Sequence, residues 1–268
     1  GSDAGHVRIY QNIGGSWSQI GQDIDGEAVD DQSGDEISLS SDGNTVAIGA
    51  WANSENGFYA GHVRVYENIL GTWTQIGQDI DGEAAGDYSG NSFSLSSDGN
   101  TVAIGASGND GNGNQSGHVR IYENIGGSWS QIGQDIDGEA VDDYSGWSVS
   151  LSSDGSTVAI GAPYNAENGF QSGHVRIYEN IGGSWSQIGQ DIDGEAAGNI
   201  SGWSVSLSAD GNTVAIGTPW NAGNGSDAGH VRIYQNIGGS WSQIGLDIDG
   251  EAAGDYSGQA VSLSADGN

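Results

Sequence analysis

Acidic residues recur along the chain at a spacing that could bind a cation. The run Asp135-x-Asp137-Gly-Glu139 is followed by Asp143, four residues beyond the glutamate. Its opening matches that of a Ca²⁺-binding loop, but the later ligands of such a loop are missing. The alternative is a turn whose carboxylates cap backbone amides and pair with arginine. We predict that no cofactor is required and that Ca²⁺ is possible, with candidate ligands Asp135, Asp137, Glu139 and Asp143 and their equivalents Asp23, Asp25, Glu27, Asp31, Asp79, Asp81, Glu83 and Asp87.

Histidine and arginine also alternate in the chain, as at His174 and Arg176. Such a pair could supply a general base and a cation that binds an anion. The same pair recurs four more times at one register, in the middle of an expected strand. Catalytic residues normally form a single constellation, so this repetition indicates scaffold, with buried arginines paired to nearby acids. No nucleophile and base stand out, and the sequence predicts that the protein is not an enzyme.

The tryptophans divide into two groups. Five occupy one position of a repeated pattern and are expected to pack the interior: Trp17, Trp73, Trp129, Trp185 and Trp241. The others, with one tyrosine, lie where the pattern varies. A constant scaffold with varying aromatic side chains is typical of a binding surface, although drift after duplication is an alternative. The predicted ligand-binding residues are Trp51, Trp147, Tyr164, Trp203 and Trp220, and the predicted partner is a protein or a carbohydrate.

These residues are carried by a repeat of 56 residues. The string Gly-His-Val-Arg-(Ile/Val)-Tyr begins at Gly5, Gly61, Gly117, Gly173 and Gly229, without insertion or deletion. Residues 1–21 recur letter for letter as residues 225–245. We therefore expect a single domain over 1–268, built from units 5–60, 61–116, 117–172, 173–228 and the partial unit 229–268.

Each unit contains four expected strands. Segments 147–152, 157–162, 174–178 and 185–192 are apolar or alternate with period two, which predicts strands. Asp154-Gly155 between the first two predicts a tight hairpin with a primed turn. No segment has helical periodicity. Four short strands in a repeat of this length are typical of a β-propeller blade, so the fold class is all-β, a β-propeller of four-stranded antiparallel blades.

The number of blades depends on how the ends meet. The chain begins with a third and fourth strand and ends with one first strand, so these pieces could share a composite closing blade in a five-bladed ring. Five whole units would need 12 more residues than the 268 present. A longer array, or self-association through the incomplete blade, is therefore an alternative to closure within one chain.

Composition excludes several partners. The net charge is −31, from 36 acidic residues against five arginines and no lysine. Nucleic-acid binding requires cations that neutralise phosphates, so no nucleic-acid partner is expected. No stretch approaches the roughly 18 apolar residues of a membrane span, so no membrane insertion is expected. Without cysteine the chain forms no disulfide.

Segment 145–163, which reads Ser-Gly-Trp-Ser-Val through Gly-Ala-Pro, and the following Gly173-His-Val-Arg-Ile-Tyr178 resemble the FG-GAP repeat. This repeat builds the propeller of integrin α subunits and of many bacterial surface proteins. The resemblance implies an extracellular or cell-surface propeller that binds or adheres without catalysis. The alternative is a structural spacer in a longer repetitive surface protein. Family members hold Ca²⁺ between the first two strands, but segment 152–156 has only one carboxylate, so that site is not transferred.

Overall fold

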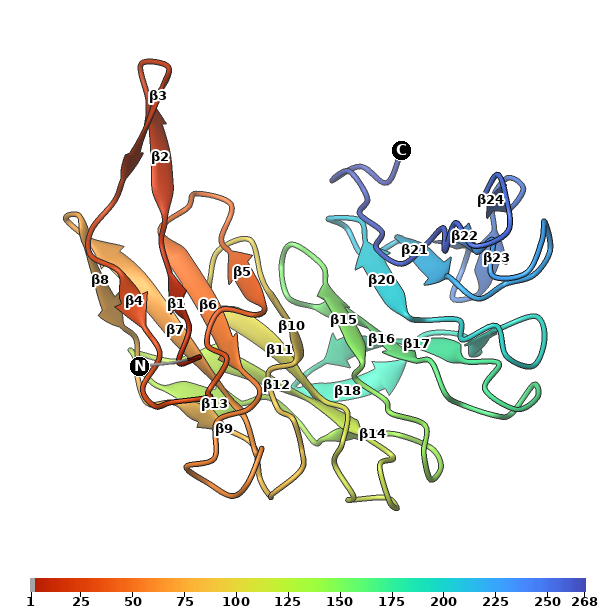
Figure 1. Ribbon diagram of the computed structural model, residues 1–268, viewed down its shortest axis with the longest axis horizontal. Helices are drawn as coiled ribbons and strands as arrows, with labels where there is room; N and C mark the ends of the chain where they lie inside the picture. Colours follow the sequence, from red (N-terminus) through yellow and green to blue (C-terminus); the bar gives the residue numbers. More distant parts are fainter. Residues whose placement is uncertain (1–2) are drawn as a thin grey trace.

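The computed structural model describes residues 3–268, which form β-strands joined by turns and loops, without a helix. Four sheets follow one another along an arc, and each has its strands in the order of the sequence (Figure 1). The inner edge of the arc is formed by the first strand of each sheet, β5 (Ile37–Leu39), β10 (Ser92–Leu95), β15 (Ser148–Leu151) and β20 (Ser204–Leu207). Repeated four-stranded antiparallel sheets of this kind confirm the predicted propeller architecture.

The other strands lie progressively further from the inner edge. Second strands are β6 (Thr45–Ala50), β11 (Thr101–Ala106), β16 (Thr157–Ala162) and β21 (Thr213–Thr218). Third strands are β7 (His62–Ile69), β12 (His118–Asn124), β17 (His174–Ile181) and β22 (His230–Asn236). Fourth strands are β8 (Thr72–Gln75), β13 (Trp129–Gln131), β18 (Ser184–Gln187) and β23 (Trp241–Gln243).

The predicted fourth strand is in fact two short strands with a break between them. In the third complete sheet, β18 pairs with the end of β17, and β19 (Ile192–Asp193) pairs with its beginning, where His174 lies opposite Asp193. Gly189, at φ +73°, opens the break, because glycine adopts positive φ without steric cost. The same return strand occurs as β9 (Ile80–Asp81), β14 (Ile136–Asp137) and β24 (Ile248–Asp249). The break displaces Asp191 from the ladder and turns it toward His174.

The hairpin at Asp154-Gly155 is longer than predicted. Strand β15 ends at Leu151 and β16 begins at Thr157, so five residues form the loop. Only Gly155 has a positive φ there, whereas a two-residue primed turn of type I′ needs two such residues. Asp154 instead accepts hydrogen bonds from the Ser152 hydroxyl and the Ser156 backbone N–H, which fixes the wider loop.

Neighbouring sheets share their core. Apolar residues of one blade, such as Val119, Ile121 and Ile136, pack against those of the next, such as Val158 and Trp185. The inner strands are joined by serine side chains that accept hydrogen bonds from backbone N–H groups of the next blade. Examples are Val149 to Ser92 and Leu151 to Ser94, both 3.0 Å. The serine of the alternating strand therefore forms a bond between blades that a buried apolar side chain would not provide.

The glycines of the FG-GAP-like motif lie where blades approach most closely. A Cβ atom at Gly161 would lie 2.1 Å from the carbonyl oxygen of Gly202 in the next blade. Gly202 itself has φ +82°. Only glycine fits at position 161, and glycine is strongly favoured at position 202. This explains why the Ser-Gly half and the Gly-Ala-Pro half of the motif both contain glycine.

The predicted composite closing blade is not formed. At the N-terminal end, β1 (His6–Val7) pairs with β4 (Ile24–Asp25), and β2 (Tyr10–Ile13) pairs with β3 (Ser16–Gln19). Within residues 3–268, no strand pairing joins these elements to the final segment 259–268. The two chain ends lie apart on an open arc (Figure 1). Among residues 3–268 no second strand lies between β1 and the final segment 259–268.

Candidate functional site

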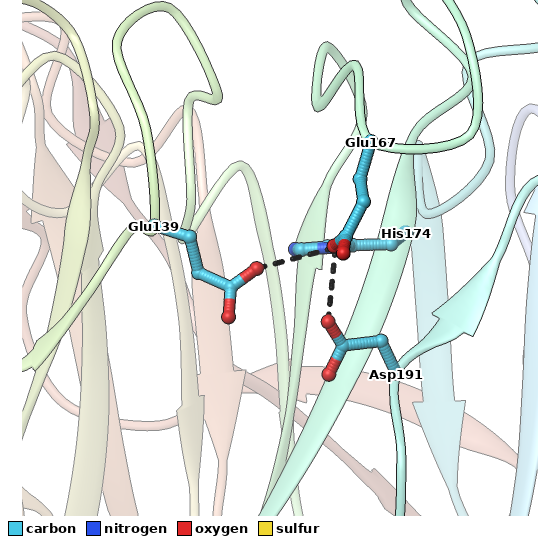
Figure 2. Close-up of side chains that lie close together, drawn as sticks. All are labelled: Glu139, Glu167, His174 and Asp191. Carbon is cyan, nitrogen blue, oxygen red and sulfur yellow. Dashed lines mark ion pairs between the residues drawn. The ribbon is translucent and has the colours of Figure 1, made fainter.

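Four ligand-type side chains converge beside the third complete sheet (Figure 2). They are Glu139, which follows β14, Glu167 in the loop after β16, His174 at the start of β17, and Asp191 in the break before β19. One ligand atom from each lies within 4.8 Å of the others. His174 Nδ1 is 3.7 Å from Asp191 Oδ2 and 3.9 Å from Glu139 Oε2. We call these four residues the carboxylate–histidine cluster.

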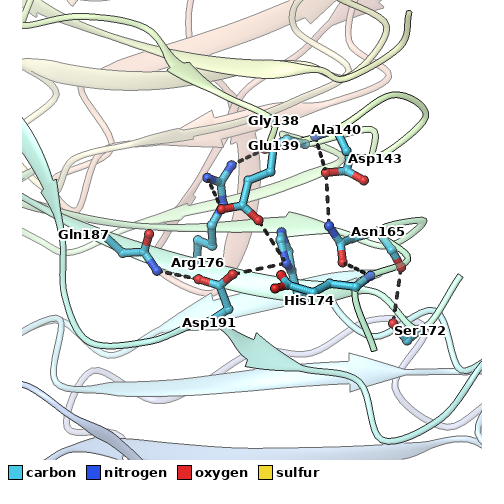
Figure 3. A network of polar contacts seen from close by, with 12 residues as sticks. Gly138, Glu139, Ala140, Asp143, Asn165, Ser172, His174, Arg176, Gln187 and Asp191 are labelled. Atoms are coloured by element: carbon cyan, nitrogen blue, oxygen red, sulfur yellow. Dashed lines mark hydrogen bonds and ion pairs between the residues drawn. The ribbon is translucent and has the colours of Figure 1, made fainter. Parts of the chain in front are cut away.

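Neighbouring polar groups orient two of the carboxylates (Figure 3). Gln187 donates a hydrogen bond of 2.6 Å to Asp191 Oδ1, which leaves Oδ2 facing His174. Arg176 Nη1 lies 3.5 Å from Glu139 Oε1, which leaves Oε2 facing the same ring. Arg176 is itself held by a 2.7 Å bond to the backbone carbonyl of Asp137. Each carboxylate thus has one oxygen engaged and one directed into the cluster.

His174 is the unusual member of this group. The residue has no exposed surface, and neither ring nitrogen has a hydrogen-bond partner. Its contacts at 3.7 and 3.9 Å are too long for hydrogen bonds. Burial, together with the nearby Arg176 charge, lowers the pKa of His174 from 6.5 to about 4. The ring is therefore neutral at pH 7, and Nδ1 can present a lone pair to the carboxylate-lined space.

Desolvation raises the pKa of Glu139, whereas it lowers that of His174. Burial raises the pKa of its carboxyl, while Arg176 lowers it and Asp191 raises it further. A carboxylate with a raised pKa is a stronger base than one in water. Glu139 is the group of the cluster that this effect suits to accept a proton.

Three sister clusters occupy the same position beside the other sheets. They are Glu27–His62–Asp79, Glu83–His118–Asp135 and Glu195–His230–Asp247. Each lacks the fourth ligand. Gly111 and Gly223 stand where the third unit has Glu167, and Glu55 of the first unit lies outside its cluster. The four-ligand arrangement therefore depends on one residue of a variable loop.

The predicted metal ligands do not meet at one point. Asp135 lies 3.9 Å from His118, whereas Glu139 joins His174 one blade further on. Asp143 is buried and accepts hydrogen bonds from the Ala140 backbone N–H and from Asn165, as a capping residue does. Asp31 and Asp87 cap backbone N–H groups in the same way. The backbone carbonyls of Asp25 and Asp81 accept hydrogen bonds from arginines, and Asp23 pairs with Arg8. The remaining predicted ligands belong to the sister clusters: Glu27, Asp79 and Glu83.

The expected ladder of ion pairs between blades is confirmed. Arg176 pairs with Glu139 of the preceding blade, and the equivalent distances are 3.3 Å for Arg64–Glu27, 3.4 Å for Arg120–Glu83 and 3.7 Å for Arg232–Glu195. The arginine side chains are nearly fully buried, and their partners are partly exposed. Repetition of the pair is therefore structural, as the sequence indicated.

Four of the five predicted ligand-binding aromatics form one row. Ring centroids are 4.7 Å apart for Trp147–Trp203 and 4.6 Å apart for Trp203–Trp220. Tyr164 extends the row, 5.9 Å from Trp147. Trp51 lies in a separate group with Tyr59 and Tyr88, and its indole N–H donates to Asp35. All five side chains are partly exposed.

A cleft of about 760 Å³ lies beside one end of the aromatic row, at Tyr164 and Trp147. Tyr164, Ala166 and Phe170 line it from the loop after β16, and Trp147 lines it from the start of β15. Glu167 directly follows Ala166, so one loop contributes to the cleft and to the carboxylate–histidine cluster. The cleft is large enough for a small molecule, and none of the four cluster residues is part of its lining.

Sequence reasoning did not identify this site as a unit. Glu167 and Asp191 were not proposed as ligands, and His174 was assigned to the scaffold. The one available signal was that Glu167 is absent from the second and fourth copies of the loop, where glycine replaces it. The break in the fourth strand, which places Asp191, has no equally clear sequence pattern.

Comparison with known proteins supports the fold. The FG-GAP repeat matches residues 135–178, which confirms the resemblance. No curated protein matches the sequence. The periplasmic gluconolactonase of Pseudomonas aeruginosa superposes with a TM-score of 0.58 at 17% identity, over 90% of this chain and 63% of that one. A Bacteroides fragilis protein assigned as a 6-phosphogluconolactonase gives 0.58 at 12% identity, over 92% and 66%.

These neighbours correct the functional prediction. Both are described as lactonases, so the arrangement of sheets found here is one that carries enzymes. The prediction of a non-catalytic binding and adhesion propeller, and the statement that the protein is not an enzyme, are therefore wrong. The chain spans less than two thirds of the length of either neighbour, and at these identities the likeness shows the fold alone. Among residues 3–268 no helix is long and apolar enough to cross a membrane.

Proposed function

We propose that this protein hydrolyses a neutral sugar lactone at the carboxylate–histidine cluster, with a divalent cation bound between Glu139, Glu167, His174 and Asp191. The observation that carries the proposal is His174, a buried imidazole without a hydrogen-bond partner that faces the carboxylates. Buried polar atoms are nearly always satisfied, so an unsatisfied ring nitrogen among three acids favours a bound ion. The lactonase neighbours support the class of reaction.

The charges and distances suit one divalent ion. Three carboxylates against the single Arg176 charge leave an excess of two negative charges, which one such ion balances. The four ligand atoms lie within 4.8 Å of one another, so one ion could contact all of them after small side-chain movements. The shortest separations from His174 Nδ1 to the carboxylates of the set are 3.7 and 3.9 Å, to Asp191 and Glu139.

The ligand set favours a transition metal over Ca²⁺. Calcium takes six to eight oxygen ligands, whereas an imidazole nitrogen with carboxylates suits Zn²⁺ or Mn²⁺. Gln187 and Arg176, which orient Asp191 and Glu139, would serve as the outer partners that such sites use. We therefore expect Zn²⁺ or Mn²⁺ rather than the Ca²⁺ considered from the sequence.

The protein residues would assist hydrolysis in a defined way. A water oxygen forms a bond to the lactone carbonyl carbon, the ring C–O bond breaks, and the proton lost by water passes to the ring oxygen. A cation held by the cluster would polarise the carbonyl and the water.

Charge indicates which lactone is accepted. A net charge of −31 repels a phosphorylated substrate, since the field of the whole protein acts on an approaching anion. Tyr164 and Trp147 line the cleft and would stack on the apolar face of a sugar ring. We therefore expect a neutral lactone such as gluconolactone, and an extracytoplasmic location like that of the periplasmic neighbour.

The test is lactonase activity with and without metal. Chelator-treated protein is assayed on glucono-1,5-lactone by acid release, above the spontaneous rate, before and after addition of Mn²⁺ or Zn²⁺. Glu167→Gly reproduces the second unit, which has Gly111, and should lower the rate at least about tenfold if the fourth ligand completes the site. Glu55→Gly, the same loop position in the first unit, is the matched control and should retain the full rate. A wild-type rate equal to the spontaneous rate under all metals would overturn the proposal.

A further inference from the structure

Each end of the array exposes a blade face whose equivalents inside the array are buried between neighbouring blades. Trp17 is 70% exposed, whereas Trp73, Trp129 and Trp185 at the same position are 3–4% exposed. At the other end Ile248 is 56% exposed, while its equivalent Ile192 is 5% exposed. These exposures differ because, among the described residues, no sheet precedes Trp17 and no sheet follows Ile248.

The C-terminal face forms an apolar groove of about 640 Å³. Its lining includes Ala215, Val231, Ile233, Ile244, Val261 and Leu263. One blade earlier, the equivalent Ala159, Val175 and Ile177 are fully covered by residues of the next sheet, including Trp241. Apolar side chains that are covered in one blade and uncovered in the next are candidates for an interaction site.

We propose that a second copy of this chain docks β2 and β3 into the groove, with Trp17 directed at the carbonyl oxygen of Ile244. The contact already exists inside the array. Trp241 donates its indole N–H to the equivalent carbonyl, that of Ile188, at 2.9 Å. Residues 1–21 are identical to residues 225–245, so the N-terminal strands of a second copy carry the side chains that this face accepts from the next sheet.

The contact is head-to-tail. The surface around Trp17 and the groove around Ile244 are different patches of one chain, so the interface is heterologous and each added copy leaves one of each patch free. Association therefore extends into a chain of copies or closes as a ring. This inference does not depend on the proposed hydrolase activity, because the cluster lies between sheets within one copy.

Two features weaken the contact and can be varied. The charge of −31 on each copy opposes association, and added salt screens that repulsion. In addition, Gln22, Gln78 and Gln134 each donate to the backbone carbonyl of the next tryptophan at 2.8–3.1 Å. The equivalent at the C-terminal face is Leu246, which is 89% exposed and donates no such bond. Leu246→Gln would restore this bond at the junction.

Sedimentation of the purified chain at increasing concentration, in low and high NaCl, tests the inference. We expect the mass to rise from the monomer value of 27.4 kDa to multiples of it, more readily in high salt. Trp17→Ala and Ile248→Lys alter residues that are exposed in the single copy, so both should fold and remain monomeric. Leu246→Gln should lower the concentration at which association begins. Leu70→Asp, at a fully exposed hairpin tip, is the control and should associate as the wild type does.

Mixing the two monomeric variants separates this contact from a symmetric one. Trp17→Ala retains an intact groove and Ile248→Lys retains an intact Trp17, so an equimolar mixture should form a dimer that cannot grow. A wild-type chain that stays monomeric throughout, including one whose own ends meet, would overturn the proposal. So would association that survives Trp17→Ala unchanged.

Discussion

The repeated tryptophan of the fourth strand provides a matched test of what joins one blade to the next. Trp185 is 4% exposed, and its indole N–H donates to the carbonyl of Ile132 in the preceding blade at 2.9 Å. Trp17 occupies the same repeat position but is 70% exposed. Trp185→Ala and Trp17→Ala therefore remove the same atoms, once from an interior and once from a surface.

The expected difference follows from burial. Replacing a buried tryptophan by alanine costs about 3–5 kcal/mol in free energy of unfolding. Leaving the Ile132 carbonyl without its donor adds about 1 kcal/mol. An exposed substitution such as Trp17→Ala is usually within about 0.5 kcal/mol of neutral. We expect Trp185→Ala to lose roughly 4–6 kcal/mol more than Trp17→Ala.

Urea denaturation measures this difference at a protein concentration where the chain is monomeric. Far-ultraviolet circular dichroism is the appropriate signal, since each variant lacks one tryptophan and its fluorescence. In a repeat array each unit contacts only its neighbours, so Trp185→Ala should also broaden the transition as the two halves uncouple. Losses that agree within about 0.5 kcal/mol, the usual error of such comparisons, would refute the account of how blades are joined.

Three further results are expected. Burial and the Arg176 charge lower the pKa of His174 from 6.5 to about 4. Unfolding therefore takes up a proton in this range, and the free energy of unfolding falls as the pH drops from 6.5 toward 4. His174→Gln should reduce that fall, measured by urea denaturation, by up to about 1.4 kcal/mol per pH unit, and an unchanged pH profile would contradict this. Gly161→Ala places a Cβ 2.1 Å from the Gly202 carbonyl oxygen and should lower stability by about 1–3 kcal/mol; an unshifted urea midpoint would argue against the close approach. Trp203→Ala, in the middle of the aromatic row, should raise KM for a sugar lactone and leave kcat unchanged in initial-rate assays, and an unaltered KM would remove the row from substrate binding.

Much of the fold could be predicted because the repeat encodes it locally. Alternation in 147–152 and the apolar run 157–162 specify strands, and the constant position of Trp185 specifies a contact made in the four sheets. Trp17, which was also predicted to pack the interior, is instead exposed. The paired titratable groups His174 and Arg176 were correctly placed in a buried strand by their repetition alone. These features depend on residues close in sequence, or on a contact that recurs identically.

The site could not be predicted in the same way because its members come from separate segments. Glu139 belongs to the preceding unit, and Asp191 reaches His174 only because the chain breaks at Gly189. Treating repetition as proof of a purely structural role also hid the variation at the Glu167 position, which is glutamate in the first and third copies and glycine in the second and fourth. Ring closure failed for another reason: among residues 3–268 no strand pairs with both end segments.

Binding of Mn²⁺ tests the central claim most directly. The titration is followed by electron paramagnetic resonance in buffered salt with excess Mg²⁺, so that the many exposed acids do not contribute. We predict one tight site for each chain, retained in Glu55→Gly and lost or strongly weakened in Glu167→Gly and His174→Gln. Absence of a tight site, or a site that is unaffected when His174 and Glu167 are replaced, would contradict the assignment of the carboxylate–histidine cluster as the functional centre.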